Sequence, residues 1–386
     1  MSLKNYLDKI KPHFEEGGKL HALWSLYDGL ESFLLVPDTT SKNGSSIHDP
    51  IDSKRIMSFV VIALMPALLF GMYNVGYQNA LAAGKLAETG FWTMFFYGFL
   101  AVLPKILVSY IVGLGIEFAW AQWKHEEIQE GYLVTGIIIP LIIPVNTPLW
   151  ILALAVAFSV IFVKESFGGT GMNIFNVAIS ARMFMFFSYP SQMTGDKAWV
   201  ATQSICGLGY DLHLPDGFTA ATPLGEMAQN VNVNFNWDMV TGFIPGSIGE
   251  TSVIAIALGG LLLIITGIAS WKTIVGVFLG GGILGTIFNA TGALTMPWYD
   301  YLLLGGFCFG AVFMATDPVT SARTETGKWI YGFIIGAMAI IVRVMNPGYP
   351  EGMMLAIFFG NMIAPLIDYC VVERNIAKRA RRAVNK

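Results

Sequence analysis

The sequence predicts an all-α polytopic membrane protein, and three observations support this prediction. Of the 386 residues, 54% are hydrophobic and only 13% are charged, whereas soluble domains carry about 25% charged residues. Several segments hold roughly 18 or more mostly apolar residues, the length that an α-helix needs to cross a bilayer. The lysines and arginines are also distributed unevenly between these segments, which is typical of the loops of multi-pass membrane proteins.

We expect about ten transmembrane helices. The expected spans are 56–75, 92–122, 132–145, 148–165, 173–188, 251–269, 272–290, 299–316, 328–346 and 352–372. The third and eighth spans look short and end at Pro144 and Pro318. Broken helices of this kind are tolerated in a membrane where they line a buried site.

The positive residues fix the expected orientation, because loops rich in lysine and arginine stay in the cytoplasm. With a cytoplasmic N-terminus, eighteen of these residues fall inside and two outside, Lys85 and Lys197. The inner residues are seven in the N-terminal tail, then Lys124, Lys164, Lys272, Arg323 and Lys328, then Arg374, Lys378, Arg379, Arg381, Arg382 and Lys386. Both termini are therefore expected in the cytoplasm, and the 189–250 loop is expected in the periplasm.

The expected organisation has five parts. They are a cytoplasmic tail (1–55), membrane repeat one (56–188), the periplasmic loop (189–250), membrane repeat two (251–372) and a basic tail (373–386). Short matches support the repeat, such as Val163-Lys164 with Val342-Arg343, and Asn176 with Asn361. Five spans per repeat give the halves opposite orientations, an inverted-repeat architecture. The alternative is chance similarity between apolar segments.

Several functional classes find no support in the sequence. The net charge of −3 and the lack of a basic patch argue against nucleic acid as a partner. Cys206, Cys308 and Cys370 are far apart and lack metal-ligand spacing, so no metal site is expected. No G-x-G-x-x-G segment follows a predicted strand, so we do not expect this chain to bind NADH itself.

The most informative motif lies in the polar 189–250 loop. The segment Asp216-Gly-Phe-Thr219-Ala-Ala-Thr222 is similar to the flavin-attachment motif Asp-x-x-Ser/Thr-x-Ala-Thr. In that motif the last threonine hydroxyl is esterified by the phosphate of FMN. An exposed loop gives a modifying enzyme access to Thr222, and Asp216 and Thr219 are expected to help present it. The alternative is an ordinary polar loop.

Further motifs resemble one protein family along nearly the whole chain, the B subunits of sodium-pumping NADH:quinone reductases. The matching stretches are Gly17–Lys19, Lys54–Met57, Gly71–Asn74, Gly168–Gly171 with Asn173 and Asn176, Ile244–Glu250, Phe313–Pro318, Asn346–Met353 and Val371–Asn375. One departure is Ala220, where the family's flavin motif commonly has glycine. The D subunits of ion-pumping ferredoxin:NAD reductases share the fold and the flavin threonine, and they usually lack a long N-terminal tail.

The resemblance implies an inner-membrane subunit of a six-subunit bacterial complex with two flavins. It implies that a flavin-attaching transferase attaches FMN to Thr222 and that riboflavin is held without a covalent bond. Electrons are then expected to arrive from a partner subunit, pass from FMN to riboflavin and reduce ubiquinone or menaquinone, coupled to Na⁺ export. The alternatives are the D subunit of the ferredoxin complex, and a transporter or channel without a redox role.

The resemblance places riboflavin at Asn173 and Asn176. Two asparagines at i and i+3 share one face of a helix, and their amides offer donors and acceptors to the edge of a flavin ring. The Gly168–Gly171 run permits close approach of the backbone. Without the resemblance, the same glycines are a tight turn.

The resemblance also implies roles for a glycine and three acids. Gly113 and Asp28 match positions linked to quinone, although the family's second glycine is Leu114 here. A fourth acid, Glu117, lies within an expected span, where an ionisable residue is costly and is by default a functional hypothesis, and we expect it at the quinone site. Asp317 and Asp368 match acids on the sodium or proton pathway. The structural alternatives are close helix packing for Gly113, a turn before Pro318 for Asp317, an interfacial charge for Asp368 and a solvated acid for Asp28. For Arg182 and Arg343 we expect partner carboxylates rather than flavin contacts. The sequence singles out no catalytic residue.

Overall fold

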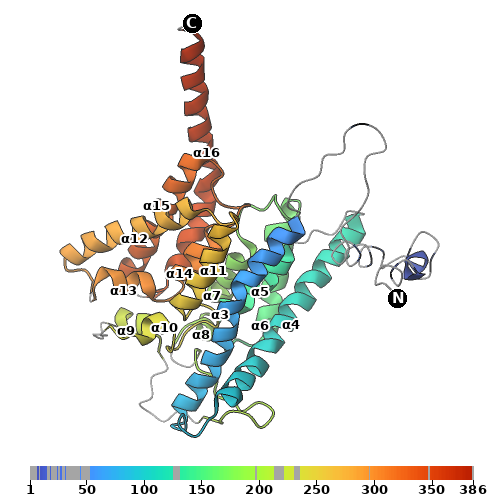
Figure 1. Cartoon of the computed structure of the whole chain (residues 1–386), viewed down its shortest axis with the longest axis vertical. Coiled ribbons are helices and arrows are strands. Elements are labelled where there is room, and N and C mark those ends of the chain that lie inside the picture. Colours follow the sequence, from blue (N-terminus) through green and yellow to red (C-terminus); the bar gives the residue numbers. More distant parts are fainter. Residues whose placement is uncertain are drawn as a thin grey trace.

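The computed structural model describes residues 53–124, 131–195, 198–212, 221–229, 235–294, 296–346 and 348–384, together with positions 7, 9–14, 18, 24, 27, 31 and 44. Helices dominate this part of the chain, which contains no β-strand. Figure 1 shows the helices packed into one body, from which the end of the last helix projects. The all-α class is thereby confirmed.

Within the described residues, six helices are long and apolar enough to cross a membrane. They are α3 (Ser53–Ala82), α4 (Phe91–Lys124), α6 (Leu149–Phe158) with its continuation, α12 (Trp271–Ala290), α15 (Glu325–Met345) and α16 (Met353–Val384). Their outer faces carry large apolar side chains, such as Ile111 of α4 at 69% exposure. Exposed apolar surface on this scale suits lipid rather than water as the surrounding medium.

The remaining elements are shorter. Three are apolar helices, α5 (Tyr132–Leu141), α7 (Val177–Ser188) and α11 (Val253–Ile265). The eighth expected span is divided into α13 (Trp298–Leu303), α14 (Phe307–Phe309) and the π-helical turn η5 (Gly310–Met314). Helix α6 continues through the π-helical turn η3 (Ser159–Lys164) and the 3-10 turn η4 (Glu165–Phe167). The others are η1 (Lys11–His13), α8 (Pro190–Met193), α9 (Pro223–Ala228) and α10 (Asp238–Thr241).

The predicted short third and eighth spans are thus confirmed. The backbone polar groups freed by such breaks need partners inside the protein. After α5, Gly249 donates its backbone N–H to the Leu141 carbonyl at 2.7 Å. The side-chain amide of Asn361 of α16 lies 3.1 Å from the backbone nitrogen of Asn176. The repeat match aligns these two asparagines with each other. The inverted relation of the two halves stays a prediction.

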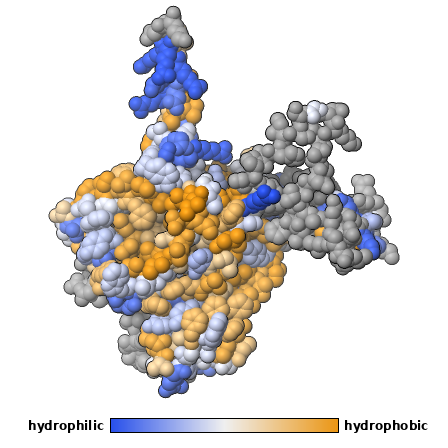
Figure 2. Space-filling view, in the orientation of Figure 1, coloured by the Kyte–Doolittle hydropathy of each residue, from blue (hydrophilic) through white to orange (hydrophobic). Residues whose placement is uncertain are grey.

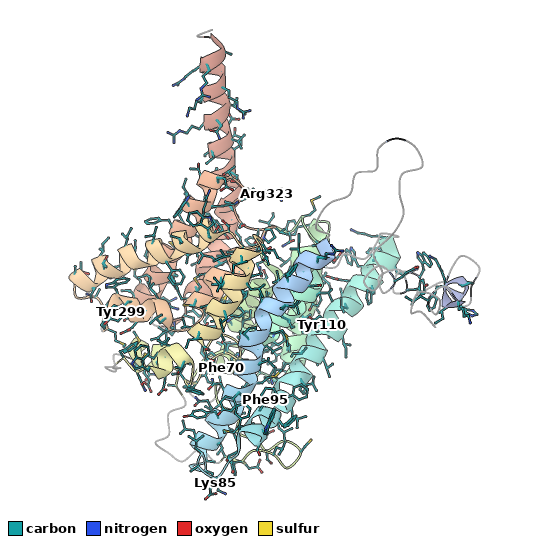
Figure 3. The ribbon with its side chains drawn as sticks, in the orientation of Figure 1. Phe70, Lys85, Phe95, Tyr110, Tyr299 and Arg323 are labelled. Carbon is teal, nitrogen blue, oxygen red and sulfur yellow. The ribbon has the colours of Figure 1, made fainter. Side chains whose placement is uncertain are left out.

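Both ends of the molecule are more hydrophilic than the body between them (Figure 2). Figure 3 places Lys85, between α3 and α4, at one end of the body and Arg323 near the other, where α16 leaves. Figure 2 shows a largely apolar body between the hydrophilic projection of α16 and smaller hydrophilic patches at the opposite end. The predicted tenth span ends at residue 372, but α16 continues as an exposed basic helix to Val384.

Helices α12 and α15 cross through glycines on both sides, an arrangement that lets two membrane helices approach closely. A β-carbon at Gly336 of α15 would lie 1.9 Å from the Val277 carbonyl oxygen. One at Gly280 of α12 would lie 2.1 Å from the Phe333 carbonyl oxygen. Since these neighbours are backbone atoms, they cannot turn away as a flexible side chain does.

Gly336→Ala is therefore expected to destabilise the protein by about 1–3 kcal/mol, the usual cost of overpacking. Gly282→Ala is the matched control, because its new β-carbon would meet the Trp298 ring at an ordinary 3.4 Å. The melting temperatures of both variants are measured by heating the detergent-solubilised protein and monitoring the folded fraction by size-exclusion chromatography. Equal melting temperatures for the two variants would contradict the close crossing.

Candidate functional site

Thr222 begins helix α9 and faces a cavity of about 400 Å³. Its hydroxyl oxygen accepts a hydrogen bond from the Gly225 backbone nitrogen at 3.1 Å, and Pro223 follows at the first helical position. Threonine before proline is a common helix start. We call this space the Thr222 cavity. In Figure 1, α9 lies on the side of the body away from the projecting end of α16.

Aromatic rings and one arginine line the Thr222 cavity. Phe186, Trp199 and Tyr349 contribute the rings, and the centroids of Phe186 and Tyr349 lie 4.3 Å apart. Arg182 of α7 also lines it. The volume falls within the range of small-molecule sites, which combine apolar walls with a few polar groups. The lining, which also includes Glu351, therefore suits a flat aromatic ring system with polar edges.

Two carboxylates share Arg182 at the wall of the cavity. Its Nη1 donates to Glu250 Oε1 at 2.8 Å and its Nη2 donates to Glu351 Oε2. Glu250 Oε2 is buried and has no hydrogen-bond partner. Burial raises the pKa of the Glu250 carboxyl, Arg182 opposes this rise and Glu351 adds to it. The expected partner carboxylates of Arg182 are confirmed.

Arg343 of α15 binds backbone carbonyls instead of a side-chain carboxylate. Its Nε donates to the Glu351 carbonyl at 2.9 Å, its Nη2 donates to the Leu304 carbonyl at 3.0 Å and its Nη1 donates to the Tyr301 carbonyl. The expectation of a partner carboxylate for Arg343 is therefore wrong. The break between α13 and α14 leaves carbonyls without helical partners, and a buried guanidinium with five donors satisfies them.

A second cavity, of about 110 Å³, lies at the start of α7. We call it the Asn176 cavity. Its polar lining is Lys164, Asn173, Asn176, Asp317 and the threonines Thr135, Thr170 and Thr316. Ile56 and Met57 line it from the start of α3, which lies toward the projecting end of α16 in Figure 1. The two cavities therefore adjoin the same helix, α7, from different sides of the body.

The prediction that Asn173 and Asn176 share a helix face is wrong. Helix α7 begins at Val177, and Asn176 caps it by accepting hydrogen bonds from the nitrogens of Ala178 and Ile179. Asn173 lies in the preceding loop and donates to the Phe175 carbonyl at 2.9 Å. An asparagine at a helix start replaces the first backbone partners, and positive φ angles at Gly168, Gly169 and Gly171 exclude helix before it.

Asp317 joins the Asn176 cavity, whereas Asp368 lies elsewhere. Asp317 Oδ2 accepts from Asn176 Nδ2 at 3.1 Å and from the Thr320 hydroxyl at 2.9 Å, and its Oδ1 accepts from the Val319 nitrogen. The bond from Val319 closes a turn around Pro318, which is the structural role expected for Asp317 as the alternative to an ion pathway. The structure thus brings Asn173, Asn176 and Asp317 together.

Asp368 of α16 holds the turn before α15. Its carboxylate accepts from the backbone nitrogens of Arg323 and Thr324 at 2.7 and 3.0 Å, and from the Thr324 hydroxyl at 2.6 Å. Its carboxylate oxygens are therefore already engaged by the chain's own donors.

Gly113 and Glu117 of α4 face the protein interior. A β-carbon at Gly113 would lie 1.9 Å from the Tyr132 ring, so this glycine permits the close packing of α4 and α5. Glu117 is 4% exposed and forms an ion pair with Lys164. Asp28, Asp216 and Thr219 lie outside the residues that the structure describes.

Sequence reasoning missed the role of Lys164. It was expected in an inner loop, but it is 3% exposed and lines the Asn176 cavity. The available signal was its position at the end of an apolar span, where a buried charge needs a partner. Trp199 and Tyr349 of the Thr222 cavity were also missed, because loop aromatics carry no periodic pattern.

Comparison with known proteins agrees with this architecture. Residues 40–377 match the NQR2, RnfD, RnfE family. The chain is 42% identical to the B subunit of the Na(+)-translocating NADH-quinone reductase of Chromohalobacter salexigens, over 99% of this chain and 97% of that protein. It is also 42% identical to the corresponding protein of Pseudoalteromonas atlantica, over 99% of this chain and 100% of that protein. These matches show that the chain belongs to the NQR2, RnfD, RnfE family.

Proposed function

We propose that this chain is the membrane subunit of a sodium-pumping NADH:quinone reductase that carries FMN on Thr222. The observation that carries the proposal is the position of Thr222 at the edge of an aromatic cavity with a buried arginine. The named relatives over the full length support the same complex. We further propose the inner membrane of a bacterium as its location, with both termini cytoplasmic and the Thr222 loop periplasmic.

The residues of the Thr222 cavity fit FMN in three ways. The Thr222 oxygen supplies the phosphoester bond, and the small residues Ala221 and Gly225 leave room beside it. The rings of Phe186, Trp199 and Tyr349 offer stacking surfaces. Arg182 and Glu351 add polar groups to the same wall. A flavin bound there supplies the redox chemistry, and the chain positions and tunes it.

The Asn176 cavity is the proposed riboflavin site. Its amides, hydroxyls and Asp317 carboxylate offer both donors and acceptors to the polar edge of a ring. The cavity volume of about 110 Å³ is below the roughly 300 Å³ of typical ligand sites, so we expect it to enclose that edge rather than the whole ring. Arg182 follows Asn176 by six positions, which is about 9 Å along a helix. The residues that line the two proposed sites are therefore close along α7.

We also propose residues for a quinone site and for a sodium or proton pathway. Gly113, Glu117 and Asp28 stay the proposed quinone residues, and Asp317 and Asp368 stay the proposed residues of the sodium or proton pathway. The partners are the other subunits of a six-subunit complex and the transferase that attaches FMN. The D subunit of a ferredoxin:NAD reductase is the alternative, because the matching family includes RnfD. The partner encoded by a neighbouring gene, an NADH-binding flavoprotein or a ferredoxin-like protein, separates these two.

Loss of covalent flavin from Thr222→Ala tests the proposal. After expression with the transferase, the denatured parent is expected to show flavin fluorescence in a gel, and Thr222→Ala is expected to show none. Thr222→Ser keeps a hydroxyl and is expected to keep at least part of the signal. Thr241→Ala is the matched control, since this threonine lies in the same loop and its hydroxyl donates to the Trp237 carbonyl. Equal fluorescence from Thr222→Ala and the parent would refute attachment at this residue.

A further inference from the structure

Lys164 and Glu117 form a buried ion pair beside the Asn176 cavity. Lys164 Nζ donates to Glu117 Oε1, and both side chains are 4% exposed. Lys164 Nζ also lies 5.9 Å from the centroid of the Tyr132 ring. Of these three residues, only Lys164 lines the cavity. The pair therefore connects a charge at the cavity wall with an acid on α4.

The hydrogen bonding of the Lys164–Glu117 ion pair is incomplete within the described residues. Burial of two charges in an apolar interior is costly unless the remaining polar atoms are satisfied. Glu117 Oε2 is buried without a hydrogen-bond partner, and Glu117 is the one hydrogen-bond acceptor that the described residues provide for Lys164 Nζ. A bridge retained only for stability would be expected to satisfy these atoms. The incomplete pairing indicates a second use for the charge.

The local backbone supports this reading. Lys164 is the last residue of the π-helical turn η3, and Asp317 follows the π-helical turn η5 closely. Single π-turns inside helices are frequently found at functional sites. Asp317 is held by three donors, whereas Lys164 is held by one carboxylate oxygen. Among the described residues that line the cavity, Lys164 is the cation.

We propose that Lys164 is a positioning residue that stabilises negative charge on a ring bound at the Asn176 cavity, and that Glu117 limits this effect. The inference rests on the proposed riboflavin site. A ring that accepts an electron becomes more negative by one unit charge. A nearby ammonium stabilises that charge strongly in a low-dielectric interior, and a carboxylate beside the ammonium offsets part of it. The two residues therefore act on the reduction potential in opposite directions.

Potentiometric titration of the non-covalent flavin in the purified complex tests the proposal. Lys164→Met is expected to lower the ratio of reduced to oxidised flavin at a fixed potential at least tenfold, about 59 mV for one electron. Glu117→Gln is expected to raise the ratio. The double variant K164M/E117Q removes both charges, leaves no unpaired buried ion and is expected to lie below the parent. Lys105→Met is the control, because this lysine is buried on α4 but does not line the cavity.

The outcomes separate this inference from the riboflavin proposal. Shifts of the same sign in Lys164→Met and Glu117→Gln, or none, would overturn the role of Lys164, because a purely structural bridge treats its two ends alike. The flavin site itself is tested by acid-extractable flavin in Asn173→Ala and Asn176→Ala. Normal flavin content in both asparagine variants would refute the site. Loss of flavin from the asparagine variants, together with unshifted potentials in Lys164→Met and Glu117→Gln, would refute only the inference.

Discussion

Replacement of Arg182 by methionine is expected to have the largest effect on stability of any single change near the proposed sites. The change leaves the carboxylates of Glu250, whose side chain is 2% exposed, and of Glu351, whose side chain is 16% exposed, without their shared cation. Removal of one partner from a buried ion pair typically costs about 3–5 kcal/mol. We therefore expect little folded Arg182→Met protein after extraction in detergent, measured as the monodisperse fraction in size-exclusion chromatography.

A second variant keeps this prediction informative. The double variant Arg182→Met with Glu250→Gln removes the buried charge that has lost its partner, so it is expected to recover much of the folded fraction. Arg323→Met, at an exposed arginine, is the control and is expected to match the parent. If Arg182→Met were as stable as Arg323→Met, the three-residue cluster would not hold α7 to the loops that follow α10 and α15.

Asn176→Ala is expected to have the largest effect on non-covalent flavin. It removes the cap of α7, at a cost of about 0.5–2 kcal/mol, and the amide that donates to Asp317 at 3.1 Å. Asn176→Ser keeps a capping oxygen but also lacks the amide. We therefore expect both variants to lose most of the acid-extractable flavin, whereas only the alanine variant loses stability.

Flavin extraction and thermal unfolding on the same preparations separate these two roles. The matched change Asn146→Ser removes an amide that bonds the Val200 carbonyl at 2.7 Å, away from the Asn176 cavity. Its flavin content is expected to stay at the parent level. Full flavin retention in Asn176→Ser would show that the Asn176 amide does not contribute to binding.

Hydropathy predicted the class of fold, because backbone polar groups in lipid must form hydrogen bonds within the protein, and a helix satisfies them inside one apolar segment. It predicted the ends of α4 and α12 to within a few residues. It missed the end of α3, which reaches Ala82 rather than residue 75. The reason is tertiary. Asn79 in this extension is buried and donates to the carbonyls of Ala201 and Tyr210, so a distant loop satisfies it.

The candidate sites were predicted only in part, and the difference follows from what a linear sequence holds. Thr222 and Asn176 were found from motifs, and each lines a cavity. The sequence predicts Lys164 as an inner-loop charge, because its partner, Glu117, is 47 residues away. The ion pairs of Arg182 with Glu250 and Glu351 likewise form only because α7 packs against two loops that lie far along the chain. Such long-range pairs leave no local periodicity.

The most direct test of the central claim is the mass of the peptide that contains Thr222, from protein purified out of its native membrane. We expect a flavin and phosphate adduct on this peptide, with fragmentation placing it on Thr222. An unmodified Thr222 peptide, from cells that attach flavin to other proteins, would contradict flavin attachment and favour a transporter without a redox role.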